Sequence, residues 1–138
     1  MNSRVEERCI AQGVRMTDQR RTIAKVLSES TDHPDVDQVH ARAVKLDPET
    51  SITTVYRTLR LFEEAGVLEK HDFRQRRFRY EEATDQPHDH LIDVKTGDIL
   101  EFYAPEIEQI LEEHAKTLGY QLIDRRLELY AIPLTKDA

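Results

Sequence analysis

The clearest structural pattern in this chain is Ser51-Ile52-Thr53-Thr54-Val55-Tyr56-Arg57-Thr58-Leu59-Arg60-Leu61-Phe62. Apolar residues recur here at the spacing of an α-helix, so the pattern predicts a helix with one buried side. The expected buried stripe is Ile52, Val55, Leu59 and Phe62. The opposite face carries Thr53, Arg57 and Arg60, with Tyr56 at the border. Such a helix either enters the major groove of DNA, where arginine pairs with guanine edges, or simply faces solvent.

Two shorter helices are expected before this one. Thr17 and Asp18 form a typical helix start, and the apolar residues Ile23, Val26 and Leu27 follow at helical spacing. That helix ends before His33-Pro34, because a residue that precedes proline avoids the α region. Asp35 is expected to cap the next helix. The buried side of that helix is predicted to contain Val36, Val39, Ala43 and Leu46.

A basic hairpin is expected after the long helix. Residues 67–73 and 78–81 are predicted strands, and the turn between them is Arg74-Gln75-Arg76-Arg77. Three arginines in one turn repel each other unless a polyanion such as a DNA backbone neutralises them. Alone, such a turn indicates only solubility, but next to the preceding helix it favours DNA binding. Three helices and a hairpin form a winged helix, which is a helix-turn-helix variant.

The second half of the chain is predicted to be a small α/β domain. The polar segment 83–87 separates a winged-helix DNA-binding domain (1–82) from a dimerisation and metal-sensing domain (88–138) and acts as a hinge. The expected order is ββαββ, with strands at 88–94, 99–102, 120–123 and 127–132 and a helix from Pro105 that Gly119 ends. Fewer than 60 residues make a small core with exposed sheet edges, which predicts a homodimer. The fold class is therefore α+β.

Charge is distributed unevenly along the chain. Residues 1–83 hold 15 Lys and Arg against 15 Asp and Glu, whereas residues 84–138 hold 5 against 12. The net charge of −7 argues against nonspecific coating of nucleic acid, but it allows a local basic face. The single cysteine, Cys9, excludes an intrachain disulfide. Its spacing from Val5 fits the apolar side of a further, first helix at the start of the chain, so we expect Cys9 to be buried. No apolar run reaches the ~18 residues of a membrane span, and no secretory signal is visible, so we expect a cytoplasmic protein without membrane contact.

A candidate metal site surrounds His88-Asp89-His90-Leu91-Ile92. Histidines two residues apart lie on the same side of a strand. Glu81 and Glu101 bracket the pair, and imidazole with carboxylate binds manganese, iron, cobalt or zinc. His33, in a loop between helices, could approach the hairpin in space.

Other residues near this pattern are weaker candidates. Asp89 points away from its two neighbours, so it could join a second site with Glu108 or be solvated. His40, His71 and His114 show no convergent partners, and we expect them to be structural.

Several motifs together resemble the ferric uptake regulator (Fur) family. They are Thr17-Asp18-Gln19-Arg20, Thr53-Thr54-Val55-Tyr56-Arg57-Thr58-Leu59, Phe62-x-x-Ala65-Gly66 and the His88–Ile92 segment, and the match runs in order from about residue 4 to 133. The pattern resembles the alphaproteobacterial branch, which includes manganese uptake regulators. The resemblance implies a dimeric, metal-dependent repressor that binds double-stranded operator DNA and controls metal-uptake genes. It also implies an N-terminal winged helix and a C-terminal dimerisation domain.

The resemblance also implies site residues. Tyr56 and Arg57 would lie on the recognition helix, and Arg15, at the end of the first helix, would reach toward the minor groove. The implied metal ligands are His33, Glu81, His88, His90 and Glu101. The implied DNA contacts, together with those expected from the helix and the turn, are Arg15, Thr53, Tyr56, Arg57, Arg60, Arg74, Arg76 and Arg77.

Departures from the family pattern are informative. Asp93 and Thr96 stand where many relatives have Cys-x-x-Cys, so the structural zinc site is expected to be absent. Pro87 and Arg125 replace two histidines of a further site, which leaves Asp89 and Glu108 as a weak second site. Arg125 could instead pair with one of these carboxylates. We therefore expect one divalent metal per subunit, Mn²⁺ or Fe²⁺, with Zn²⁺ also binding in vitro.

Two other classes of function remain open at this point. A metal-buffering or storage module would bind the same ions, but it would not need Tyr56, Arg57 or the arginine turn. A metallohydrolase could use two histidines and a carboxylate, but no general base is visible beside them. A regulator rather than an enzyme is therefore the favoured hypothesis.

Overall fold

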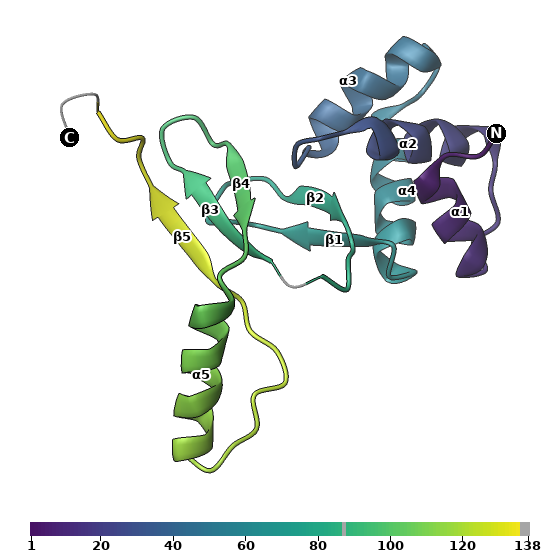
Figure 1. The fold of residues 1–138 in the computed structure, drawn as a ribbon. Coiled ribbons are helices and arrows are strands. Elements are labelled where there is room, and N and C mark those ends of the chain that lie inside the picture. Colours follow the sequence, from purple (N-terminus) through teal and green to yellow (C-terminus); the bar gives the residue numbers. More distant parts are fainter. Residues whose placement is uncertain (87, 136–138) are drawn as a thin grey trace. The chain divides into compact units, whose positions relative to one another are not determined.

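The computed structural model describes residues 1–86 and 88–135 of the chain. Contacts within the chain group it into two compact units, Met1–Thr84 and Asp85–Ala138 (Figure 1). The boundary lies inside the predicted hinge, whose last residue, Pro87, is outside the described residues. Over the described ranges, five helices and two small sheets form the α+β fold that the sequence predicts.

The N-terminal unit begins with four helices, and each has a side chain that caps its first turn. They are α1 (Arg4–Ala11), α2 (Asp18–Glu29), α3 (Val36–Leu46) and α4 (Ile52–Glu64). Oxygens of Ser3, Thr17, Asp35 and Ser51 accept hydrogen bonds from backbone N–H groups that have no partner within the helix. The helix starts predicted at Thr17 and Asp35 are therefore confirmed.

The apolar sides of these helices meet in one core. Val55, Leu59 and Phe62 are fully buried there, as the periodicity of α4 predicts. Two residues assigned to the buried sides are exposed instead: Ile52 at 38% and Leu46 at 48%. Ile52 is the first residue of α4 and Leu46 is the last residue of α3, so both lie beyond the turns that pack against neighbouring helices. Periodicity predicts which face is apolar, but not how far the core extends along the helix.

A two-stranded antiparallel hairpin follows α4 and forms the wing. It consists of β1 (Leu68–His71) and β2 (Arg79–Glu82), in the register that pairs Leu68 with Glu82. β1 is shorter than predicted because Phe73 and Arg74 adopt the left-handed region, at φ +44° and +58°, and so end the ladder. β2 has the predicted length but begins and ends one residue later than predicted. Phe73 is buried, and this burial offsets the backbone strain of the turn.

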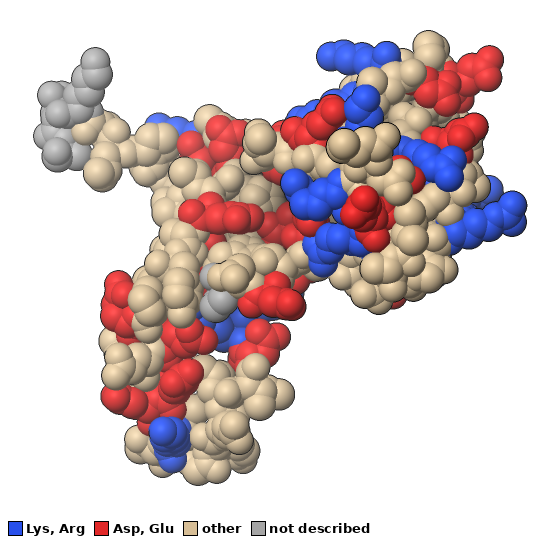
Figure 2. Space-filling model, turned by 45° about the vertical axis from the view of Figure 1, so that its right-hand side comes forward, with Lys and Arg blue, Asp and Glu red and all other residues tan. Residues whose placement is uncertain are grey.

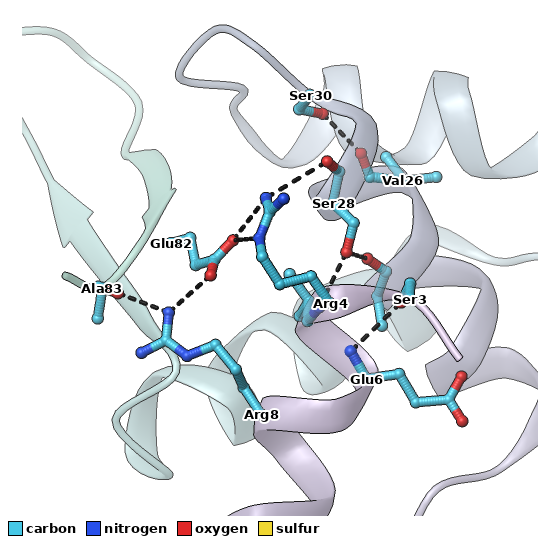
Figure 3. A network of polar contacts seen from close by, with 11 residues as sticks. Ser3, Arg4, Glu6, Arg8, Val26, Ser28, Ser30, Glu82 and Ala83 are labelled. Carbon is cyan, nitrogen blue, oxygen red and sulfur yellow. Dashed lines mark hydrogen bonds and ion pairs between the residues drawn. The ribbon is translucent and has the colours of Figure 1, made fainter. Parts of the chain in front are cut away.

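Two arginines of α1 fasten the end of the wing to the helices (Figure 3). Arg4 Nε donates to Glu82 Oε1 at 2.8 Å, and Arg8 Nη1 donates to Glu82 Oε2 at 2.8 Å. Arg8 also donates to the carbonyl oxygen of Ala83. Ser28 of α2 accepts a bond from the backbone N–H of Val5, so α1 is held to α2 as well. The last strand of the unit is thus fixed where the chain leaves it.

The C-terminal unit is a three-stranded sheet with one helix. Its elements are β3 (Asp89–Asp93), β4 (Ile99–Phe102), α5 (Pro105–Thr117) and β5 (Glu128–Ala131). β3 is central, antiparallel to β4 and parallel to β5. The predicted strand at 120–123 is wrong, since those residues form no ladder and the order is ββαβ. A strand needs a hydrogen-bonding partner, and both sides of the central strand β3 are already occupied by β4 and β5.

The C-terminal unit has little core of its own. Among its described residues, Ile92 is the only buried hydrophobic side chain, and α5 has no buried residue. Among residues 1–86 and 88–135, no helix has the length and hydropathy needed to cross a membrane.

Candidate metal centre and nucleic-acid face

His33 and Glu81 form a buried pair within the N-terminal unit. The backbone N–H of Tyr80 donates to the carbonyl oxygen of Pro34 at 2.9 Å, which holds the loop before α3 against β2. Arg79 Nη1 adds a 2.8 Å bond to the carbonyl oxygen of His33. These contacts bring His33 Nε2 to 2.7 Å from Glu81 Oε2, and both side chains are more than nine-tenths buried. The expectation that His33 approaches the wing is therefore confirmed.

The donor set of this pair fits a divalent metal ion. Two ligands at about 2.1 Å from one ion lie about 3 Å apart, close to the 2.7 Å between His33 Nε2 and Glu81 Oε2. A neutral imidazole and a carboxylate also match the preference of borderline transition metals. The pair therefore offers two ligands within the N-terminal unit.

Three more predicted ligands gather within the C-terminal unit. The rings of His88 and His90 have centroids 4.9 Å apart. His90 and Glu101 are directly opposite partners in the β3–β4 ladder, and His88 Nε2 lies 4.0 Å from Glu101 Oε1. His90 is buried, whereas Glu101 is exposed. This unit thus offers two imidazoles and one carboxylate to a metal.

One histidine expected to be structural belongs to the N-terminal group. His71 Nε2 lies 2.8 Å from Glu81 Oε1, so the expectation that His71 has no convergent partner is wrong. A β-strand pattern alone could not reveal this contact, because it depends on the register between β1 and β2. His40 contacts the carbonyl oxygen of Thr50 at 3.0 Å, as a structural histidine would, and His114 is exposed on α5.

The proposed second-site residues have other partners. Asp89 is buried and forms an ion pair with Arg125, whose Nη2 lies 3.0 Å from Asp89 Oδ2, as the sequence suggests. Glu108 Oε2 accepts a 2.7 Å hydrogen bond from the Tyr103 hydroxyl. This bond is the main reason why the pKa of Tyr103 lies above its usual value. Pro87, the other position at which a histidine is replaced, lies outside the described residues.

The outer face of α4 is exposed as predicted, with Thr53, Tyr56, Arg57 and Arg60 all open to solvent. Arg20 of α2 joins this face, because it lines a hollow of about 260 Å³ together with Arg57 and Arg60. Periodicity of α4 alone could not place Arg20 there. Arg15 is exposed, but it lies in the loop beyond α1 rather than at the helix end as expected. The carbonyl oxygen of Arg15 accepts a bond from Arg20 Nη1, which holds this loop close to α2.

The arginines of the wing turn divide into two groups. Arg74 and Arg76 are exposed near the tip. Arg77 is also exposed, but its Nη1 lies 2.7 Å from Asp35 Oδ2, so an existing ion pair competes with any phosphate contact. On the face drawn in Figure 2, Lys and Arg gather on the N-terminal unit, while Asp and Glu predominate over the C-terminal unit. The N-terminal unit is therefore the one suited to a polyanion.

Comparison with known proteins finds similarity over both units. A model of the ferric uptake regulator family matches residues 11–130. A ferric uptake regulation protein from Rhizobium leguminosarum bv. viciae is 53% identical over 133 residues, which is 96% of this chain and 94% of that protein. The structure of a zinc-bound manganese uptake regulator gives a TM-score of 0.82 at 53% identity, covering 94% of this chain and 98% of that chain. The structure of the ferric uptake regulator from Francisella tularensis with iron gives 0.80 at 32% identity, covering 88% and 92%.

Proposed function

This chain belongs to the ferric uptake regulator family, and we propose that it is a metal-responsive repressor of metal-uptake genes. It binds operator DNA as a homodimer when each subunit holds one divalent ion. One observation carries the proposal: the unit with the exposed basic face of α4 also contains the buried imidazole–carboxylate pair of His33 and Glu81. The residues proposed for DNA contact and two of the proposed metal ligands thus belong to the same unit. The relatives are named as regulators, and we assign the chain no catalytic role.

We propose that five side chains ligate the same ion: His33, Glu81, His88, His90 and Glu101. The first two belong to the N-terminal unit and the last three to the C-terminal unit. When bound, the ion supplies a crosslink between side chains that lie on both sides of the hinge. With His33 and Glu81 bound to the same ion as the other three ligands, the winged helix can adopt fewer hinge angles. Because operator DNA also selects a subset of these angles, metal and DNA each raise the affinity for the other.

The exposed residues of α4 are assigned to DNA contact. Arg57 is suited to guanine edges and Tyr56 to thymine methyl groups in the major groove. Arg15, Arg60, Arg74, Arg76 and Arg77 are assigned to phosphates or groove edges. A homodimer places two copies of α4 at a fixed spacing, which must match successive major grooves. The exposed apolar residues of α5 and β5 supply the surface for this dimer.

The metal is assigned by class rather than by element. Structures of relatives are named with zinc and with iron, and another relative is a manganese uptake regulator. Nitrogen and oxygen ligands accept all three ions, and zinc binds more tightly than manganese or iron in the general affinity order. Cellular availability therefore selects Mn²⁺ or Fe²⁺ for this chain, and purified protein also takes up Zn²⁺.

An operator can be selected and the proposal tested in one experiment. A library of random DNA duplexes is enriched on the full chain with Mn²⁺, and the winning duplex is titrated by mobility shift with Mn²⁺, with Fe²⁺ and with chelator. We expect tight binding of a palindromic duplex that is lost with chelator. Binding that ignores metal would overturn the proposal. Metal uptake without any selected duplex would favour a storage module instead.

Two variants separate the two halves of the proposal. His90→Ala should abolish the effect of metal on DNA affinity while the fold is retained. Arg57→Ala should weaken DNA binding by about 10-fold to 100-fold, the value of one good base contact, with metal affinity unchanged. Equal loss of metal binding in both variants would contradict the assignment of Arg57.

A further inference from the structure

His71 contacts the second oxygen of the Glu81 carboxylate. We propose that His71 is a positioning residue for the metal site, which holds Glu81 Oε1 so that Oε2 faces His33. This inference rests on the proposed function, because it takes Glu81 as a metal ligand. His71 itself stays outside the ligand set.

The register of the wing hairpin places His71 beside Glu81. In the β1–β2 ladder, Glu69 lies directly opposite Glu81, and His71 lies opposite Arg79. Side chains alternate along each strand, so Glu69, His71 and Glu81 share one face of the hairpin. His71 is then the diagonal neighbour of Glu81, a position from which long side chains make contact. Its Nε2 lies 2.8 Å from Glu81 Oε1, closer than the 3.5 Å to Glu69 Oε2.

Packing fixes the orientation of the His71 ring. The ring stacks on Phe73 with a centroid distance of 4.8 Å and an interplanar angle of 23°. Phe73 is 1% exposed, and the side chain of His71 is 12% exposed. Phe73 also meets the ring of His33 edge-on at 6.2 Å. One buried aromatic side chain therefore orients both histidines that contact Glu81.

The two carboxylate oxygens of Glu81 have separate partners. Oε2 lies 2.7 Å from His33 Nε2, and Oε1 lies 2.8 Å from His71 Nε2. A carboxylate turned by a quarter turn around its last bond would lose both contacts, so the two histidines together fix the plane of the group. A hydrogen-bond donor on the outer oxygen of a ligating carboxylate fixes its orientation, and removal of such a donor typically lowers metal affinity about 10-fold to 100-fold.

The test compares two substitutions of His71 in the full chain. His71→Leu removes the donor but keeps an apolar side chain against Phe73. His71→Gln keeps an N–H donor near the position of Nε2. The matched control is His40→Gln in the same unit, since His40 contacts the backbone carbonyl of Thr50, which is not a proposed ligand. Mn²⁺ affinity is measured by competition with a chelator, and the visible absorption of bound Co²⁺ reports the ligand set. Thermal unfolding of the metal-free variants checks their fold.

We expect His71→Leu to weaken Mn²⁺ binding by about 10-fold to 100-fold and to change the Co²⁺ spectrum. His71→Gln should recover most of the affinity and a Co²⁺ spectrum like that of the unaltered chain, and His40→Gln should match that chain throughout. Unchanged affinity in His71→Leu would overturn the role of His71 alone. If His71→Gln bound as weakly as His71→Leu, donor positioning would be wrong. If the unaltered chain bound neither Mn²⁺ nor Co²⁺, the proposed function itself would fail.

Discussion

The two units of this chain differ in how completely they bury their apolar side chains. In the N-terminal unit, four helices enclose a core in which Ile23, Leu59 and Phe62 are inaccessible to solvent. In the described part of the C-terminal unit, Ile92 alone is comparably buried, while Ile110 is 53% and Ile123 is 91% exposed. We infer that the N-terminal unit is stabilised by its own contacts. The C-terminal unit needs a partner surface to remove its apolar side chains from water.

The largest effect is expected from truncation in the N-terminal core. Phe62→Ala should lower the free energy of unfolding of this unit by about 3–5 kcal/mol, because the large cavity left among packed helices relaxes only in part. Ile123→Ala, at an exposed position of the C-terminal unit, should change the free energy of unfolding of that unit by less than about 0.5 kcal/mol in the separated subunit. Urea unfolding followed by circular dichroism measures both. Similar losses from the two truncations would show that the contrast between the units is wrong.

The next effect concerns the apolar stripe of α5, which includes the exposed residues Ile110 and Leu111. Ile110→Asp should raise the dissociation constant of the proposed homodimer by about 100-fold, since an unpaired carboxylate would be buried at the proposed interface. Gln109→Asp adds the same charge to the same helix outside the apolar stripe, and it should leave the dimer intact. Sedimentation velocity over a range of concentrations distinguishes the two. A monomeric Gln109→Asp, or a dimeric Ile110→Asp, would place the interface elsewhere.

The same contrast explains how far the sequence predicts the fold. Helix starts at Thr17 and Asp35 and the stripe of α4 are local, since caps and periodicity depend on residues within one turn or two. Errors occur where a distant partner decides the outcome. The spacing of Leu46 predicts that it is buried and the sequence predicts a strand at 120–123, but Leu46 is exposed and 120–123 form no ladder. Neither pattern contains the neighbour that would bury the side chain or complete the ladder.

The candidate site follows the same rule. His88 and His90 are neighbours in sequence, so strand geometry alone predicts that their rings lie together. The pairing of His33 with Glu81 spans 48 residues, and only the position of His33 in a loop near the wing and the family resemblance predict it. The contact of His71 with Glu81 cannot be predicted from the sequence, because it depends on the register between the two strands of the hairpin.

A smaller effect is expected where α1 holds the end of the wing. Glu82→Gln keeps the side-chain shape but removes the charge that binds Arg4 and Arg8, and it should destabilise the N-terminal unit by about 1 kcal/mol. Glu64→Gln is the control, because Glu64 pairs with Arg60 on the exposed face of α4 and should cost less than about 0.5 kcal/mol. Urea unfolding in low salt compares them. A loss in Glu82→Gln no larger than that in Glu64→Gln would mean that the charge of Glu82 adds no more stability than an exposed ion pair.

The smallest effect is expected from Ile110→Asp on the reactivity of Cys9, which tests whether the two units unfold independently. Cys9 is fully buried in the N-terminal core, and this burial raises the pKa of its thiol to about 11. At pH 7 only about one thiol in ten thousand is then ionised, so a thiol reagent should modify Cys9 only after the unit opens. Phe62→Ala should speed this modification more than 100-fold, roughly as its loss of stability predicts. Ile110→Asp should leave the rate unchanged, because the core around Cys9 closes without the C-terminal unit. Faster modification in Ile110→Asp would show instead that dimerisation stabilises the N-terminal core.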